Sequence, residues 1–400
     1  MVLRLIMSLY GLRQAPKTFY DKLKEGLLER GFVQSDIDPC LFLKKNMICV
    51  IYVDDTIIAG PDPAAIEELI TSLGVSNDEH RHTFGLQDEG EVGDFLGIRI
   101  KKTGSREFTL LQTGLINKVL KDSGMETCNT CPTPATVDPV HSDKSGEPFS
   151  ETWEYASIVG MLMFLANNSR PDIAFAVNQC ARFTHDPRNS HASAVKRIIR
   201  YLKGTHENGL ILLPGLDLSL DCYVDADFAG GWATENKQDP VSVKSRTGYV
   251  ITFMKCPLTW TSKLQTQIAL STMESEYIAL STAMRELIAV KQILMDINKY
   301  VFPHRNQPNI TCKTISKMFG AIPQTTVHED NSACLKFATV PKMSPRTKHI
   351  AIPYHFFRTK IKELNIQVVA INMENQLADQ FTKGLVQAKF VRDRQRLMGW

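Results

Sequence analysis

MICVIYVDDTIIAG, residues 47–60, is the stretch around which the chain is organised. Two apolar runs, Met47 to Val53 and Thr56 to Ala59, meet at the adjacent carboxylates Asp54 and Asp55, which predicts a β-hairpin with both acids at its tip. Neighbouring carboxylates repel each other, so Mg²⁺, a cation that prefers oxygen ligands, would stabilise this tip. The alternative is a solvent-exposed turn. The apolar flanks favour the metal site, because they predict a hairpin that is buried on both faces.

Length and composition set the broad class of the protein. The chain has 400 residues, enough for two or three domains, and 43% of them are hydrophobic. Its 46 basic and 43 acidic residues nearly cancel, so nucleic-acid binding would need local basic patches. Nine scattered cysteines, with no signal peptide and no apolar run of about 18 residues, predict an intracellular protein with free thiols and no membrane partner.

Short motifs accompany the hairpin. They are SLYGLRQAP (8–16), YVDD (52–55) and FLGI (95–98). In this order and at this spacing they resemble the reverse transcriptases of Ty1/copia-type retrotransposons. The resemblance implies a polymerase palm that acts on a template-primer, with Asp54 and Asp55 as metal ligands and Gln14 beside the incoming nucleotide.

The same resemblance implies that one polymerase ligand is missing. Two-metal nucleotidyl transfer needs a third carboxylate, and in the family that acid comes from a strand upstream of the SLYGL-like segment. Such a strand would precede Met1, so we expect no DNA polymerase activity from this chain alone, with an upstream Pol segment as a partner in cis or in trans. The family also has a lysine at the position of Gln87.

Helical patterns precede the hairpin and fill the middle of the chain. One helix is expected from about Thr18 to Arg30, with Leu23, Leu27 and Leu28 on one face. Further helices are expected from Phe108 to Gly124 and between residues 153 and 203. Residues 128–150 are rich in Pro, Thr, Ser and Asp and are expected to form a linker; the CxxC pair within them lacks the second half of a zinc site.

The last of these helices carries a row of cations. Lys196, Arg200 and Lys203 share one face, opposite Ile198 and Leu202. Such a face is either simply solvated or in contact with phosphates. The family has a similar pair of helices between its polymerase and its nuclease, so the resemblance implies contacts to nucleic acid.

A second acidic region begins at Asp221. Residues 221–227 alternate as a strand with Asp225 and Asp227 on one face, and two further strands are expected at 245–253 and 258–262, forming an antiparallel meander. A long helix follows from about Ser271 to Ile297.

Two glutamates of this helix differ in position. Glu276 extends an apolar stripe through Leu280, Ala283 and Leu287, whereas Glu274 falls on a polar side. A carboxylate on the packed face needs a partner. We therefore expect Glu276 to bind a metal and Glu274 to be a surface acid.

Two more acids lie at the ends of elements. Asp330 precedes a helix capped by Asn331 and Ser332, and Asp379 follows the apolar strand 366–371. Each alone would be a cap or a solvated residue. The order strand-Asp, helix-Glu, strand-end-Asp and helix-Asp resembles ribonuclease H. The Ty1/copia-type motifs are DADFAG (225–230), SRTGY (245–249), STMESEYIAL (271–280), EDNSA (329–333), RTKHI (346–350) and ADQFTK (378–383).

By matching position, the resemblance gives four metal-ligand roles to Asp225, Glu276, Asp330 and Asp379. They would hold two Mg²⁺ ions, with Mn²⁺ as the alternative. Arg346, Lys348 and His349 would contact the backbone of an RNA/DNA hybrid, the alternative being a solvated basic loop.

We therefore predict an α/β and α+β multidomain chain. Its segments are a truncated polymerase palm and thumb region (1–127), a linker (128–150), a helical connection (151–215), a ribonuclease H-like mixed sheet flanked by helices (216–384) and a C-terminal tail (385–400). The expected function is Mg²⁺-dependent hydrolysis of the RNA strand of RNA/DNA hybrids. The alternative is a non-catalytic nucleic-acid-binding remnant of a decayed element. The resemblance also implies a particle-associated cytoplasmic location.

Overall fold

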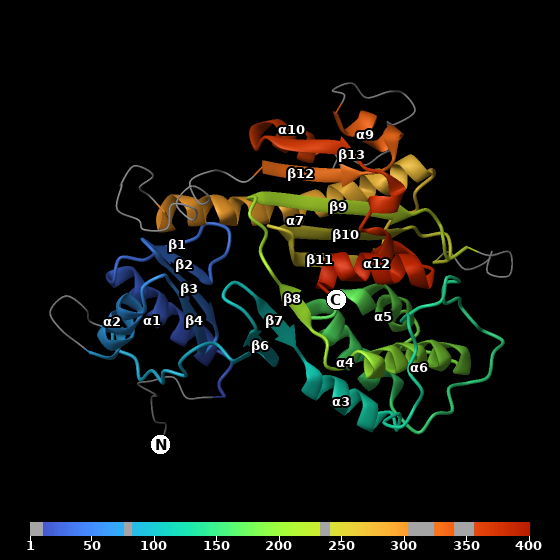
Figure 1. The fold of residues 1–400 in the computed structure, drawn as a ribbon, viewed down its shortest axis with the longest axis horizontal. Coiled ribbons are helices and arrows are strands. Elements are labelled where there is room, and N and C mark those ends of the chain that lie inside the picture. The colour runs from blue at the N-terminus through green and yellow to red at the C-terminus, as the bar shows by residue number, and fades with distance from the viewer. Residues whose placement is uncertain (1–10, 76–81, 233–240, 303–323, 340–355) are drawn as a thin grey trace, which may run out of the picture. The chain divides into compact units, whose positions relative to one another are not determined.

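The computed structural model describes residues 11–75, 82–232, 241–302, 324–339 and 356–400. Figure 1 shows a mixed α/β chain with several sheets. It divides into two compact units, the first made of residues 1–95 and 289–323 and the second of residues 96–288 and 324–400. Within the described residues, no helix is long and apolar enough to cross a membrane.

The first unit is built on a four-stranded antiparallel sheet in the order β1-β2-β3-β4. Its elements are α1 (Ala15–Glu29), β1 (Val33–Gln34), β2 (Leu41–Lys44), β3 (Met47–Tyr52), β4 (Asp55–Ala59), α2 (Pro63–Gly74) and β5 (Asp94–Phe95). Leu23 and Leu27 of α1 are buried in a core with Cys49 and Ile51 of β3. Leu28, which was expected on the same face of the helix, is instead 41% exposed.

The predicted hairpin is confirmed, but its burial on both faces is not. Strands β3 and β4 pair from Ile48–Ala59 to Tyr52–Asp55, which leaves Val53 and Asp54 as the loop. Near its base, one face of β3 packs on α1 and the other contacts the end of α7 (Thr272–Val301). Beyond those helices the tip is open: Tyr52 is 55% and Val53 45% exposed, and both acids are exposed.

The second unit contains a helical layer and two sheets. The helices that precede its main sheet are α3 (Thr113–Asp122), α4 (Tyr155–Asn168), the 3₁₀ helix η1 (Pro171–Ile173), α5 (Ala174–Ala181) and α6 (Asn189–Gly204). They share one apolar core, to which Leu162, Val177 and Ile198 belong. Arg170 and Asp172 form a fully buried ion pair of 2.7 Å beside this core, and the Tyr201 hydroxyl donates to Asp172.

The helix predicted for residues 108–124 is partly wrong. Residues Phe108–Leu111 form strand β7, which pairs with β6 (Ile98–Lys102) and with β8 (Leu210–Leu212), and only α3 is helical. The apolar run 108–111 suits either structure by itself. Its pairing with β8, about a hundred residues later, selects the strand, and this contact is invisible in the local pattern.

Residues 128–150 contain no helix or strand, yet they are attached to the helices. The Cys131 N–H donates to the Arg200 carbonyl, and Lys203 Nζ donates to the Cys128 carbonyl at 2.6 Å. The Val140 N–H donates to the side chain of Gln179. This segment therefore lies against α5 and α6 and lines a cavity of about 930 Å³ beside them.

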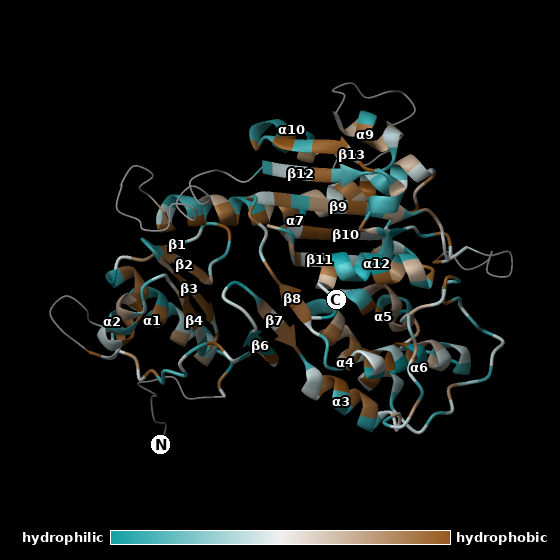
Figure 2. Ribbon diagram, viewed as in Figure 1, coloured by the Kyte–Doolittle hydropathy of each residue, from teal (hydrophilic) through white to brown (hydrophobic). Residues whose placement is uncertain are grey.

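The main sheet of the second unit has the order β11-β10-β9-β12-β13. Its strands are β9 (Ser219–Asp227), β10 (Arg246–Phe253), β11 (Cys256–Leu264), β12 (Gln324–Glu329) and β13 (Ile366–Ala370). The predicted meander of β9, β10 and β11 is confirmed as antiparallel, and β12 is parallel to both β9 and β13. Figure 2 shows that β10, which lies between β11 and β9, is hydrophobic along most of its length, as expected for a strand with both faces covered.

Helices flank this mixed sheet. The first half of α7 runs along it (Figure 1), and the apolar stripe through Leu280, Ala283 and Leu287 is buried, as predicted. The remaining elements are α9 (Ser332–Thr339), α10 (Phe357–Glu363), the 3₁₀ helix η5 (Met373–Asn375), α11 (Asp379–Thr382) and α12 (Gln387–Met398).

Candidate metal centre

Two parallel strands bring Asp225 and Asp330 together. The register pairs Tyr223 of β9 with His328 of β12. Each acid lies two residues beyond this pair, and side chains two residues apart point to the same side of a strand. Asp225 and Asp330 therefore meet at the carboxyl ends of neighbouring strands.

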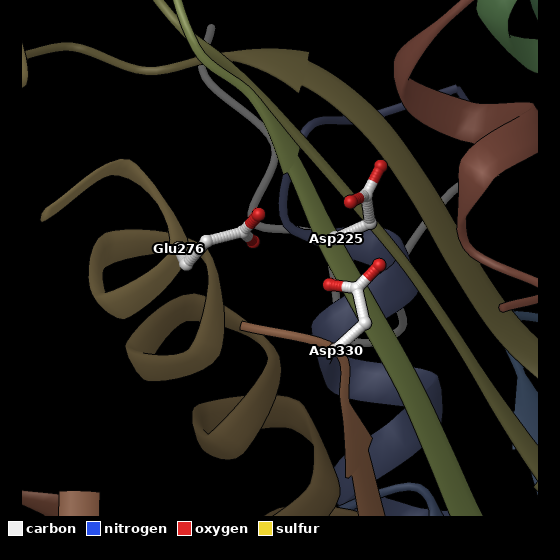
Figure 3. A group of neighbouring side chains, drawn as sticks. All are labelled: Asp225, Glu276 and Asp330. Carbon is white, nitrogen blue, oxygen red and sulfur yellow. The ribbon is translucent and has the colours of Figure 1, made fainter. Parts of the chain in front are cut away.

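Helix α7 supplies a third carboxylate. Glu276 lies in its second turn and points toward the two aspartates (Figure 3). One oxygen of each of the three acids lies within 4.8 Å of the others, and no other group of three such ligands occurs in the described part of the chain. Glu276, which was predicted to bind a metal, therefore lies next to Asp225 and Asp330.

Burial makes this group electrostatically costly. Asp225 and Glu276 are 3% and 6% exposed, and Glu276 Oε2 is buried without a hydrogen-bond partner. Burial, followed by the negative charge of Asp225, raises the pKa of Glu276. Burial also raises the pKa of Asp225 and of Asp330. An unpartnered oxygen among carboxylates, which are hard ligands, fits a divalent cation such as Mg²⁺.

Asp379 lies beside this group but outside it. Its Oδ1 is 2.6 Å from Lys383 Nζ, and its Oδ2 is 3.1 Å from Lys389 Nζ. Lys383 Nζ also lies 3.8 Å from Asp225 Oδ2. Burial by itself would lower the pKa of Lys383, but Asp225 and Asp379 outweigh it, so the net shift is upward and the ammonium is retained.

A glycine lets α11 approach the acids. Gly248 of β10 is paired with Asp225 of β9, and an added Cβ there would lie 2.6 Å from Thr382 Cγ2 and 2.8 Å from Phe381 Cβ. Only glycine allows this contact between β10 and α11. As a result, the Thr382 hydroxyl reaches Asp225 and donates a hydrogen bond to its Oδ2.

The interpretation of Glu274 as a surface acid is wrong. Its side chain is 6% exposed, and its Oε2 accepts a 2.8 Å hydrogen bond from the Leu270 N–H just before the helix. Periodicity assigned it to the polar side, but at the start of a helix the free backbone N–H groups attract a carboxylate. Glu274 therefore caps α7, and its contact is separate from the acid group.

Sequence reasoning also missed Glu329, Thr382 and Lys383. Glu329 is fully buried next to Asp330, its Oε1 accepts from the Asn331 N–H, and burial raises its pKa. Nothing in the local pattern of the mostly polar strand Gln324–Glu329 indicates that its last residue is buried. By contrast, the i, i+4 spacing of Asp379 and Lys383 is a signal for their ion pair.

Three other predicted site residues belong to the first unit. Asp54 and Asp55 stand at the exposed hairpin tip, and Gln14 is exposed at the start of α1. Arg346, Lys348 and His349 lie outside the described residues.

The predicted row of cations on α6 is largely occupied by the chain itself. Lys196 Nζ lies 2.5 Å from Glu151 Oε1, and Lys203 donates to the Cys128 carbonyl. Arg200 is exposed. Two of these three cations therefore hold the neighbouring segment rather than forming an open basic face.

Comparison with known proteins finds a matching family model and several similar proteins. A family model described as reverse transcriptase (RNA-dependent DNA polymerase) matches residues 1–137. The retrovirus-related Pol polyprotein from transposon RE1 of Arabidopsis thaliana is 34% identical over 393 residues, which cover 97% of this chain and 24% of that protein. The corresponding polyprotein from transposon TNT 1-94 of Nicotiana tabacum is 31% identical over 404 residues, 98% of this chain and 28% of that protein. The chain thus spans about a quarter of the length of these relatives.

Among solved structures, LC11-RNase H1 isolated from compost matches 41% of this chain and 92% of its own, with 15% sequence identity and a TM-score of 0.24.

Proposed function

Because the chain belongs to the Ty1/copia-type retrotransposon Pol polyproteins, we propose that its second unit hydrolyses the RNA strand of an RNA/DNA hybrid, as a ribonuclease H. The observation that carries this proposal is the group of Asp225, Glu276 and Asp330, whose oxygens lie within 4.8 Å of one another. Two of these acids are buried and the third is half-buried, so the group is destabilising by itself and becomes favourable when it binds cations. The unfavourable free energy of placing three carboxylates together is consistent with a functional site.

The residues of the chain have separate tasks in this reaction. Asp225, Glu276 and Asp330 would hold divalent ions, with Asp379 as a fourth ligand. The Thr382 hydroxyl orients the carboxylate of Asp225 through its hydrogen bond. When bound, a pair of Mg²⁺ ions lowers the pKa of water and stabilises the charge that develops on the phosphate and on the leaving 3′ oxygen. Asp225 and Glu276 are buried, so bulk water has little access to their carboxylates.

The substrate class follows from the family and from the chemistry. Such a site acts on the phosphate backbone, so selection of an RNA/DNA hybrid would depend on groove shape and on contacts to the 2′-OH groups of the RNA strand. We therefore expect cleavage with little dependence on base sequence, and with Arg346, Lys348 and His349 among the backbone contacts.

The test is cleavage of a hybrid whose RNA strand is end-labelled, with 10-fold steps of Mg²⁺ at about neutral pH. Wild type should cleave only with the metal, and Asp225→Asn and Glu276→Gln should not cleave. Glu274→Gln is the matched control, because it changes a buried glutamate of the same helix that caps the backbone instead. Wild-type turnover no higher than that of Asp225→Asn, together with hybrid binding insensitive to Mg²⁺, would indicate the non-catalytic binding remnant.

We further propose that the first unit is part of a polymerase palm in which Asp54 and Asp55 are metal ligands. Among the described residues these two acids have no third acid close enough to complete a group of three. Primer extension on an RNA template by this chain alone should therefore be undetectable. A clear Mg²⁺-dependent extension product, absent in Asp54→Asn, would contradict this expectation.

A further inference from the structure

Lys383 connects two acids of the candidate metal centre. Among the ion pairs of the described residues, it is the only cation that reaches two of the four predicted ligands, with Nζ at 2.6 Å from Asp379 Oδ1 and 3.8 Å from Asp225 Oδ2. Lys389 occupies the other oxygen of Asp379 but makes its second ion pair with Asp393, away from the acid group. The two lysines therefore differ in position although both neutralise Asp379.

The ammonium group of Lys383 lies between Asp225 and Asp379, where a cation shared by these two acids would bind. In two-metal sites the ions are about 3.5–4 Å apart and are joined by bridging carboxylates. Asp225 belongs to the group of three acids and also faces Lys383, so it borders both places. Asp379 cannot offer Oδ1 to a divalent ion while the ammonium is 2.6 Å away.

We propose that Lys383 is a tethered cation that occupies, in the metal-free protein, the place of the ion shared by Asp225 and Asp379, and that it must leave before these acids bind a divalent ion. This inference rests on the proposed nuclease function. The Lys383 side chain is 48% exposed, and a flexible four-carbon stem carries its ammonium group. The ammonium group can therefore move away from the acids without unfolding of the surrounding structure. Lys383 is a positioning residue: it keeps the carboxylates of Asp225 and Asp379 in place and competes with the second ion.

Competition has a measurable consequence. Two cations that exclude each other from one place weaken each other's binding by the same factor. Replacing Lys383 by Met removes the competitor and keeps much of the apolar stem, so the weaker of two divalent ions should bind about tenfold more tightly. The metal-free variant should also melt at a lower temperature than the metal-free wild type, because Asp225 and Asp379 lose their shared partner.

The experiment is a Mn²⁺ titration of the full chain, with free Mn²⁺ measured by electron paramagnetic resonance, so that it needs no catalytic turnover. Lys389→Met is the matched control, because it removes a charge of the same sign from the same aspartate without vacating the place between Asp225 and Asp379. Lys383→Arg keeps the positive charge and should retain weak binding of the second ion. Circular dichroism of each variant verifies that it is folded.

Tighter binding of one Mn²⁺ ion in Lys383→Met, and much less change in Lys389→Met and Lys383→Arg, would support the proposal. Unchanged or weaker binding in Lys383→Met, or an equal gain in Lys389→Met, would overturn it while leaving the nuclease function intact. If wild type binds no more Mn²⁺ than Asp225→Asn does, the proposed function fails as well, and the two failures are thereby distinguished.

Discussion

Replacing Glu276 by Gln should stabilise the metal-free protein at pH 8 even though it abolishes the proposed cleavage. The oxygens of Glu276 and Asp225 lie within 4.8 Å of each other. Two unit charges at that separation would repel by roughly 3.5 kcal/mol at an effective dielectric constant of about 20, and the folded protein avoids this cost only by keeping a proton on Glu276. An amide removes this repulsion and can donate a hydrogen bond to Asp225, so the buried unpartnered oxygen of Glu276 is no longer a charged group.

The pH dependence follows from the direction of the shift. Burial raises the pKa of Glu276 above its unfolded value, so the folded state binds the proton more tightly. The stability from this group is fully present below the unfolded pKa of about 4.3 and is lost as the pH rises, by up to about 1.4 kcal/mol per pH unit. We therefore expect Glu276→Gln to gain about 2–4 kcal/mol at pH 8 and less than about 1 kcal/mol at pH 5.

Thermal unfolding in EDTA at both pH values measures this effect. A gain of that size raises the melting temperature of a unit of this length by about 5–10 °C at pH 8. Glu274→Gln should show no such gain, because Glu274 accepts a backbone hydrogen bond at the start of the helix. Loss of stability in Glu276→Gln at pH 8, or an equal gain at pH 5, would refute the electrostatic reasoning.

Three further outcomes are expected. Mg²⁺ at about ten times its dissociation constant should stabilise wild type by roughly 1.4 kcal/mol and leave Asp225→Asn unchanged in a melting experiment; equal shifts in both would place the binding elsewhere. Lys196→Ala should leave hybrid affinity within about twofold and lower stability by at most about 1 kcal/mol, because Lys196 is paired with Glu151; a fall in the salt dependence of hybrid binding would show that it contacts phosphate instead. Arg170→Met should cost about 3–5 kcal/mol in urea unfolding, since it leaves Asp172 buried and charged, and a loss below about 1 kcal/mol would contradict this.

The sequence was most informative where the residue pattern within a single helix or strand determines its structure. Period-two alternation predicted β9, and the 3.6-residue stripe placed Glu276 on the packed face of the long helix. It failed where distant segments compete for the same residues. Residues 108–111 became a strand because β8 pairs with them, and Lys196 and Lys203 of α6 contact residues 128–151 because that segment lies against the helix.

The candidate metal centre also depends partly on local patterns and partly on contacts between distant segments. That Asp225 and Asp330 meet depends on the parallel register of β9 and β12, whose intervening chain is about a hundred residues long, so local patterns could suggest the two acids but not their distance. The burial of Glu274 has a different cause, because a carboxylate in a first helical turn is drawn to the backbone whatever the stripe predicts.

The segment 378–383 acts as one structural unit in the metal-free protein. Its short helix fits against Gly248, and this contact carries a hydroxyl, Thr382, and an ammonium group, Lys383, to the buried carboxylate of Asp225. An added methyl group at Gly248 would displace that helix and withdraw both partners while leaving every acid in the sequence. Gly248→Ala should therefore lower the stability of the metal-free protein more at pH 8 than at pH 5, because burial raises the pKa of Asp225 to about 7 and its carboxylate is ionised mainly at the higher pH. Equal losses at the two pH values would mean that the glycine serves packing alone, and that the acids do not depend on this segment for their charge balance.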